Sequence, residues 1–254
     1  MFRFVYKNLE VSHKLGTSQY PEDQYSKHVH YQYELIFIVN GSLEYFVDGE
    51  SRVLKEGDIV LVHPGKSHFA DVINDEKYER FVLKFDNTIL PLFLDEKLSK
   101  QGTFFNRSSK YSIIFQDFYN YYKNFKTDEE KFVLFTNDII KLCIYLSNEQ
   151  SSESTSKHTF INDILNYINK HINENISLDT LSKTFMFSKS YISTEFKKHT
   201  RTTVMSYIRT QKVIYAHKLI LNGEKKSTAA ILAGFDEYST FYRCYTKIIG
   251  KNHN

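Results

Sequence analysis

Hydrophobic and polar positions alternate in short runs between residues 33 and 85. The runs are YELIFIV, LEYFV, DIVLV and YERFVLKF, and turn-forming residues separate them. Asp48-Gly49, between two of these runs, is a strong hairpin signal because both residues accept the positive φ of a type I′ turn. Several short antiparallel strands of this kind predict a β-sandwich or a β-barrel.

The period of the pattern changes to that of a helix after residue 107. One set of apolar residues, spaced by four, seven, eight and eleven, is Tyr111, Phe115, Phe118, Tyr119 and Tyr122. A second set, spaced by three and four, is Phe132, Phe135, Ile139, Leu142 and Leu146. Both sets predict amphipathic helices, so a helical hairpin follows the strands. The hairpin is expected to cover the barrel and to present a shared surface to a second copy of the chain, and simple intramolecular packing is the alternative.

A polar stretch, SNEQSSESTSK, follows at residues 147–157 and has no apolar periodicity, so it is typical of an exposed linker. It divides the chain into an N-terminal domain over 1–147, a linker over 148–157 and a C-terminal domain over 158–254. Everything after the linker has helical spacing, and Ser177 and Ser188 are expected to cap two of the helices. The sequence therefore predicts an α+β multidomain protein.

One short motif occurs twice in the C-terminal domain. SYISTEFKK at residue 190 and STFYRCYTK at residue 239 are shifted by 49 positions, and Ile192 and Phe196 correspond to Phe241 and Tyr245. The opposite faces also correspond, as stripes spaced by three, four and seven. These stripes are Ser190, Ser193, Thr194 and Lys197 in one unit and Ser239, Tyr242, Arg243 and Thr246 in the other. A repeated helix-turn-helix has such a solvent-facing stripe for the major groove, and a helical bundle with polar faces is the alternative.

The segment between the two motifs, Val204 to Leu221, is expected to form a helix of 18 residues. At about 1.5 Å per residue it is roughly 27 Å long. A rod of this length holds two recognition helices about one DNA turn, near 34 Å, apart, so both enter successive major grooves on one face of a duplex.

The charge of the chain is divided unequally. Residues 1–156 hold 18 Lys and Arg against 23 Asp and Glu, a net charge of −5, whereas residues 157–254 hold 15 against 7, a net charge of +8. This division favours a polyanion as partner of the C-terminal domain alone. Two cysteines without metal or disulfide spacing, and the absence of an apolar run of membrane-spanning length, favour a soluble cytoplasmic protein that is not exported.

Residues Phe160 to Lys251 resemble the paired helix-turn-helix domain of AraC/XylS-type transcriptional regulators. The matching positions are Leu181, Ser188, Ile192, Phe196, Lys197 and Lys198 in the first unit, Tyr207, Ala216, Leu219 and Ile220 in the connecting helix, and Ala230, Gly234, Phe235, Phe241 and Tyr245 in the second unit. The chain departs from the family pattern at Arg201, where glycine is usual, at Lys212, where arginine is usual, and at Ala229, where a larger aliphatic residue is usual. It also lacks the usual Pro and Tyr-Arg ending, which predicts a weaker second unit.

The resemblance implies which residues contact double-stranded promoter DNA. The expected base-reading residues are Ser190, Ser193, Thr194, Tyr238, Ser239, Tyr242 and Arg243. The expected phosphate contacts are Lys189, Lys197, Lys198, Arg201, Lys225 and Lys226. Arg243 is the expected guanine contact, because a guanidinium binds O6 and N7 of one base together.

The N-terminal domain carries a separate constellation. His28, His30 and Glu34 share even parity, so an unbroken strand places them on one face, and His68 follows a Pro64-Gly65 turn. With Gly41 and Gly57 they resemble the cupin motifs. Three interpretations remain open: a pocket for a small organic effector, a metal site of three imidazoles and a carboxylate, and histidines with a structural role.

These patterns together predict a transcriptional regulator that is not an enzyme and has no cofactor. A cupin-like sensor binds a small-molecule effector, and an effector with unequal affinity for two domain arrangements shifts the DNA-competent population. The family resemblance implies activation through RNA polymerase, and we expect a homodimer. The alternatives are a metal-dependent cupin enzyme with a DNA-binding tail and a regulator that acts mainly through protein partners.

Overall fold

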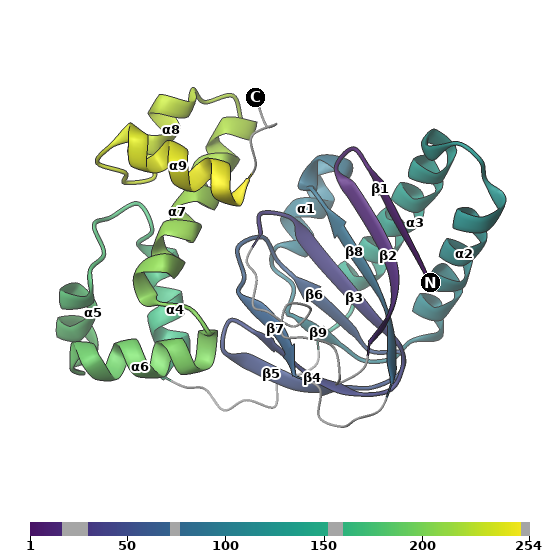
Figure 1. The fold of residues 1–254 in the computed structure, drawn as a ribbon, viewed down its shortest axis with the longest axis horizontal. Coiled ribbons are helices and arrows are strands. Elements are labelled where there is room, and N and C mark those ends of the chain that lie inside the picture. The colour runs from purple at the N-terminus through teal and green to yellow at the C-terminus, as the bar shows by residue number, and fades with distance from the viewer. Residues whose placement is uncertain (17–29, 72–76, 152–159, 250–254) are drawn as a thin grey trace.

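The computed structural model of the chain describes residues 1–16, 30–71, 77–151 and 160–249, and a β-sheet domain and a helical domain lie side by side in it (Figure 1). The N-terminal domain contains β1 (Phe2–Tyr6), β2 (Leu9–Gly16), β3 (Tyr33–Asn40), β4 (Leu43–Val47), β5 (Glu50–Leu54), β6 (Ile59–Val62), β7 (His68–Asp71), β8 (Tyr78–Phe85), the 3-10 helix η2 (Asn87–Ile89), α1 (Leu92–Leu98), β9 (Phe104–Phe105), α2 (Ser109–Asn124) and α3 (Asp128–Asn148). The C-terminal domain contains α4 (Phe160–Lys170), α5 (Leu178–Phe185), α6 (Lys189–Thr200), α7 (Val204–Leu221), α8 (Lys226–Leu232) and α9 (Tyr238–Ile248). No helix among the described residues is long and apolar enough to cross a bilayer.

Two antiparallel sheets form the cupin-like barrel. The larger sheet has the strand order β1-β2-β8-β3-β6-β9, and the smaller has the order β5-β4-β7. Strand β3 is buried on both faces because its inner side chains pack between the sheets and its outer ones pack against helices. The predicted hairpin at Asp48-Gly49 is confirmed, since it joins β4 to β5 with φ of 46° and 84° at the two residues.

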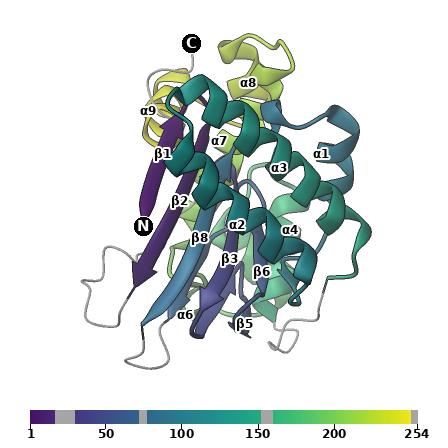
Figure 2. The ribbon, with the colours of Figure 1, turned by 90° about the vertical axis from the view of Figure 1, so that its right-hand side faces the viewer.

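Helices α1, α2 and α3 cover the outer face of the larger sheet (Figure 2). Both helices of the predicted hairpin form, and most of their apolar stripes are buried against this sheet, but Tyr119 and Tyr122 of α2 are exposed. Phe115 of α2 stacks on Phe37 of β3 with ring centroids 4.2 Å apart, and Phe118 meets Phe135 of α3 edge-on at 5.1 Å. The hairpin therefore covers the barrel, as expected, and a shared surface for a second copy stays a prediction. Strands β1, β2, β7 and β9 and helix α1 were not predicted.

Every helix predicted in the C-terminal domain is present. Ser177 and Ser188 cap α5 and α6 as expected, each accepting a hydrogen bond from the backbone N–H three residues later. Helix α7 spans Val204–Leu221, as predicted, and α4, α5 and α6 pack around its first half while α8 and α9 pack around its second half. The linker prediction falls largely on residues 152–157, which lie outside the described residues.

The helical domain contacts the barrel through the β4–β5 turn and the loop between β6 and β7. The hydroxyl of Tyr207 in α7 donates a 3.0 Å hydrogen bond to Asp48, which also forms a 3.0 Å ion pair with Lys66. Ser67 donates to the carbonyl oxygen of Thr200 at the end of α6. The contacts of Asp48 and Ser67 with the helical domain reach α7 and α6. They therefore position the region that joins the two helix-turn-helix units.

Gly49, at the tip of the β4–β5 hairpin, lies directly against α4. A Cβ atom at Gly49 would be 2.9 Å from the side-chain oxygen of Asn162 and 3.7 Å from Leu165. The turn therefore needs glycine for two reasons: a φ of 84° and the close approach of the helix.

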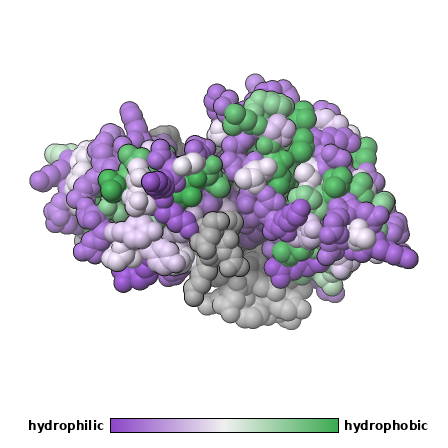
Figure 3. Space-filling view, turned by 90° about the horizontal axis from the view of Figure 1, so that it is seen from above, coloured by the Kyte–Doolittle hydropathy of each residue, from purple (hydrophilic) through white to green (hydrophobic). Residues whose placement is uncertain are grey.

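Seen from above, the two lobes meet along a furrow and both carry hydrophobic patches on a largely hydrophilic surface (Figure 3).

The geometry of a helix C-terminus explains the Gly-Phe pair before α9. Gly234 has a φ of 73°, and its N–H and that of Phe235 donate to carbonyl oxygens at the end of α8. A Cβ at Gly234 would lie 2.8 Å from the backbone oxygen of Asn173. Buried Lys212, which replaces the family's arginine, donates a 2.7 Å hydrogen bond to the carbonyl oxygen of Gly234.

We predict that Gly234→Ala lowers the free energy of unfolding by at least about 2 kcal/mol, because backbone strain and a clash with Asn173 act together. Gly223→Ala is the matched control. Gly223 has a φ of 97° and no atom within 4 Å of an added Cβ, so it tests the strain alone, about 1 kcal/mol. Urea titrations of both variants measure the difference, and equal losses would show that the close approach at Gly234 has no energetic effect.

Candidate DNA-binding faces and effector site

Helix α6 exposes the stripe that the sequence predicted. Its apolar residues Ile192 and Phe196 are fully buried against α4 and α7. Ser190 and Thr194 are exposed and Ser193 is half-buried, on the opposite face. The exposed cations Lys189, Lys197, Lys198 and Arg201 flank this stripe, and an open groove runs along Ser193, Thr194, Lys197, Lys198 and Arg201.

Helix α9 presents the corresponding stripe in the second unit. Phe241 and Tyr245 are buried, and the hydroxyl of Tyr245 lies 2.8 Å from Nδ1 of buried His217 in α7. Tyr238, Ser239, Tyr242 and Arg243 are exposed. Within the described residues the guanidinium of Arg243 has no ion pair or hydrogen bond, so it is available to an external acceptor.

The helices that carry the two stripes, α6 and α9, lie at opposite ends of α7 (Figure 1). Phe196 of α6 packs on Tyr207 near the start of the rod, with ring centroids 5.6 Å apart, whereas the apolar face of α9 packs around Val213 and Ala216 near its end. Neither stripe faces inward. Both stripes are therefore exposed, and their fit to successive major grooves stays a prediction.

Some of the predicted phosphate contacts already have partners within the chain. The ammonium of Lys189 pairs with Asp179 of α5, and Lys198 lies 3.8 Å from Glu195. Arg201 is the C-cap residue of α6, with a φ of 54°, and this left-handed conformation explains why the family usually has glycine there. Its guanidinium lies over the ring of Phe69 in β7, 5.5 Å from the centroid. Arg201 therefore contacts the barrel.

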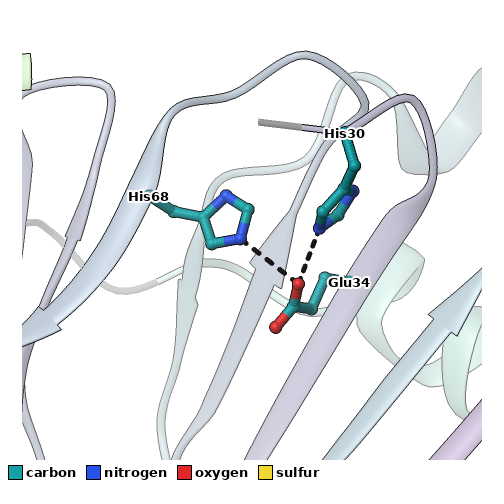
Figure 4. A group of neighbouring side chains, drawn as sticks. All are labelled: His30, Glu34 and His68. Carbon is teal, nitrogen blue, oxygen red and sulfur yellow. Dashed lines mark hydrogen bonds and ion pairs between the residues drawn. The ribbon is translucent and has the colours of Figure 1, made fainter. Parts of the chain in front are cut away.

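Inside the N-terminal domain, three of the four predicted ligand-binding side chains converge. Oε2 of Glu34 lies 2.6 Å from Nε2 of His30 and 3.2 Å from Nε2 of His68 (Figure 4). His30 precedes β3, so no continuous strand is needed to bring it to Glu34. The fourth, His28, lies outside the described residues. The ammonium of Lys84 in β8 is also 3.2 Å from Oε2 of Glu34.

Both ring nitrogens of each histidine face oxygen atoms. Nδ1 of His30 is 2.9 Å from the carbonyl oxygen of Gln32, and Nδ1 of His68 is 2.9 Å from that of Lys66. Burial lowers the pKa of His30 to about 4, against the attraction of Glu34, so this ring is neutral at pH 7. A neutral imidazole has one N–H, so the ring of His30 donates either to the carbonyl oxygen of Gln32 or to the carboxylate of Glu34, and a metal ion at Nε2 would require the first tautomer.

The donor set fits a divalent metal ion. The ligand atoms of His30, Glu34 and His68 lie within 4.8 Å of one another, and two imidazoles with a carboxylate suit zinc, nickel, iron or manganese. The backbone carbonyls that accept from Nδ1 orient both rings as metal-bound histidines are oriented. Lys84, however, already places a positive charge on the same carboxylate oxygen. A metal ion would have to compete with this ammonium.

A small cavity of about 80 Å³ lies between the two sheets beside Glu34. Its apolar wall includes Ile36, Leu43, Tyr45, Ala70 and Val82, and its charged residues are Lys14, Glu34, Arg80 and Lys84. Of the predicted pocket residues described, only Glu34 lines this cavity, while His30 and His68 hold its carboxylate in place. Two larger cavities lie elsewhere, one of about 270 Å³ between the domains and one of about 310 Å³ under α2.

Comparison with protein families decides the identity of the fold. A model described as the AraC-like ligand binding domain matches residues 11–131, and one described as a helix-turn-helix domain matches residues 181–252. The two ranges together span well over half of the chain. The chain belongs to the AraC/XylS-type transcriptional regulators. It is a DNA-binding regulator under the control of a small-molecule effector, and its AraC-type domains occur in the predicted order.

Solved structures are similar to this AraC-type chain at a low level. ToxT from Vibrio cholerae O395 is 12% identical, with 96% of this chain and 94% of that chain covered and a TM-score of 0.40. A protein from Listeria innocua is 27% identical over 37% of this chain and 90% of that chain, with a TM-score of 0.36. A cupin protein from Bacteroides fragilis is 23% identical over 32% of this chain and 68% of that chain, with a TM-score of 0.28. A search of curated protein sequences found no match.

Several residues of this AraC-type chain escaped the sequence analysis. The cations Lys14, Arg80 and Lys84 line the barrel cavity, and Asp48 and Tyr207 join the domains. Arg80 and Lys84 share the parity of Val82 in β8, but alternation alone does not tell which face is inside. Contacts between domains leave no periodic signal in a single sequence.

We predict that Lys84→Ala binds zinc at least about tenfold more tightly than the unmodified protein, because removing a positive charge within about 4 Å of the carboxylate is worth more than 1.4 kcal/mol. Isothermal titration with ZnCl2 measures the affinity, and Glu34→Gln with Lys84→Ala should abolish it. Exposed Lys55→Gln is the charge-matched control. Unchanged zinc affinity in Lys84→Ala would show that the ammonium and a metal do not compete.

Proposed function

We propose that this protein regulates transcription by inserting α6 and α9 into two successive major grooves on one side of promoter DNA. One observation carries the proposal: α6 and α9 each expose a polar stripe, and both helices pack against the same long helix, α7. Ser190, Ser193 and Thr194 would read one half of the DNA site, and Tyr238, Ser239, Tyr242 and Arg243 would read the other. The net charge of +8 on residues 157–254 supports binding to a polyanion.

The barrel cavity is the proposed effector site because its wall is connected to α6. Strand β7 lines the cavity through Ala70, and on the opposite face of this strand the ring of Phe69 stacks on Phe46 and is covered by the guanidinium of Arg201, the residue that ends α6. Next to it, Ser67 donates to the carbonyl of Thr200. An effector that binds one position of β7 better than another would change the population of α6 positions, and such a bias is sufficient for control.

The finer parts of the proposal follow from the family. Residues 1–147 would act as the sensor, 148–157 as the linker and 158–254 as the DNA-binding unit, in the cytoplasm and with RNA polymerase as a partner at promoters. The rival enzyme would consume a substrate, so turnover of small molecules by the purified protein would contradict the proposal. A regulator that acts only through protein partners would show no salt-dependent binding to promoter fragments.

We also propose that the outer face of α3 joins two copies of the chain. Val133 and Ile144 are exposed and lie eleven residues apart, with half-buried Ile140 between them on the same face. We predict that Val133→Lys with Ile144→Lys converts a dimer into a monomer, measured by sedimentation equilibrium at micromolar concentration. Exposed Lys141→Gln on the same helix should leave the mass unchanged. A monomeric unmodified protein would contradict this proposal.

We predict that Arg243→Ala weakens binding to a specific site by about 1 to 3 kcal/mol and relaxes base choice at one position, because a bidentate guanine contact is lost. Lys197→Ala is the contrasting variant. It should weaken all sequences alike and reduce the slope of log affinity against log salt by about 1. Gel shifts with a panel of single-base variants of one genomic fragment measure both effects. A uniform loss across the panel in Arg243→Ala would make Arg243 a phosphate contact.

A further inference from the structure

The barrel cavity carries an unusual arrangement of charge. Lys14 of β2 and Arg80 of β8 are direct partners in the antiparallel ladder, and both line the cavity. Like charges directly opposite each other destabilise a sheet. Lys84, on the same face of β8, adds a third cation. Three positive charges on neighbouring inward positions therefore oppose folding.

The cavity does not contain enough negative charge to balance these cations. Among the described residues Glu34 is the one carboxylate that lines it, and Glu34 is already paired with Lys84 and contacted by His30 and His68. Within the described part of the chain, neither Lys14 nor Arg80 forms an ion pair. The cavity therefore has an excess of about two positive charges.

Arg80 is held ready for an acceptor. Its guanidinium stacks on the ring of Tyr78, 4.6 Å from the centroid, and its Nη1 is buried without a hydrogen-bond partner among the described residues. A buried N–H of a charged group without an acceptor costs free energy that an anionic ligand would recover. Burial, and then the charge of Arg80, lower the pKa of Lys14, as expected for a cation that lacks an anion.

We propose that the effector carries an anionic head group, which binds between Lys14, Arg80 and Lys84, and an apolar body, which lies against the cavity wall. The apolar wall of Ile36, Leu43, Tyr45, Ala70 and Val82 supports the second part. Strand β7 carries Ala70 on this wall and Phe69 on its opposite face against Arg201, so the bound body would touch the strand that connects the cavity to α6. This inference rests on the proposed effector control and names the chemical class of the effector.

The test compares three probes by thermal unfolding of the full chain. Butyrate supplies a carboxylate and an apolar body, butyramide is its neutral counterpart, and inorganic phosphate is an anion without an apolar body. Butyrate should give a saturable rise in Tm of at least about 2 °C, and butyramide should give none. A response to phosphate equal to that of butyrate would support the anion site and assign it to a free anion. Equal responses to butyrate and butyramide would overturn the proposal.

Two variants separate a binding role from a structural one. Arg80→Gln and Lys14→Gln should each lose the response to butyrate while keeping or raising the Tm of the ligand-free protein, because repulsion across the ladder is relieved. Exposed Lys55→Gln should keep the response. A retained response in both cavity variants, or a lower ligand-free Tm without loss of the response, would mean that these cations are structural.

Gel shifts with promoter DNA, with and without butyrate, distinguish failure of this inference from failure of the proposed function. DNA binding together with no butyrate response in unfolding or in gel shifts overturns the anionic effector and leaves the regulator intact. A butyrate response in unfolding that Arg80→Gln abolishes supports the site, even where no DNA is bound. In that case the proposed DNA-binding function fails and the anion site stands.

Discussion

Helix α7 constrains the rest of the molecule, because two helix-turn-helix units and the barrel all pack against it. Tyr207 illustrates this double use. Its ring lies edge-on to Phe196 beneath the first recognition helix, and its hydroxyl donates to Asp48 of the barrel. Farther along, His217 bonds Tyr245 of the last helix and meets the ring of Tyr31 from the barrel at 4.9 Å. A displacement of the barrel relative to α7 therefore acts on the surroundings of both units.

Electrostatics in the barrel centres on a single carboxylate. Glu34 is 3% exposed, and a carboxylate so deeply buried requires positive charge or hydrogen-bond donors nearby. Lys84 supplies the charge, while the rings of His30 and His68 approach the same oxygen. A metal ion bound by His30, Glu34 and His68 would compete with the ammonium of Lys84 for the same carboxylate oxygen. The cluster thus links the candidate metal site and the anion-binding cavity through one oxygen atom.

Local signals in the sequence were sufficient for most of the fold. Periodicity and capping residues predicted α2, α3 and all the helices of the second domain, and Asp48-Gly49 predicted its hairpin. Strands β1 and β2 were missed because they lie before the alternating region, and α1 because it has only 7 residues. The base-reading stripes follow from helical spacing, so their exposure could be predicted. Odd-numbered residues of one strand need not face the same way as odd-numbered residues of another strand. Tyr45 of β4 lines the cavity, whereas Tyr33 of β3 donates a hydrogen bond to Asp95 outside it.

Hydrogen bonds between distant segments set the limit of such prediction. The contacts of Ser67 with Thr200 and of Asp48 with Tyr207 join residues more than 130 positions apart, and no local rule identifies them. The cation cavity is a similar case, since Lys14 and Arg80 become partners only through the pairing of β2 with β8. The convergence of His30, Glu34 and His68 was predicted because a motif resemblance supplied the missing three-dimensional information.

The tip of the β4–β5 hairpin has a consequence for how such chains can vary. Hairpin tips ordinarily tolerate insertions well, because they project into solvent. Here the tip lies against α4, with Gly49 against Asn162. The length of the hairpin therefore fixes the distance between the barrel and the helical domain. Relatives that share this docking would have to change hairpin length and the facing residues of α4 together.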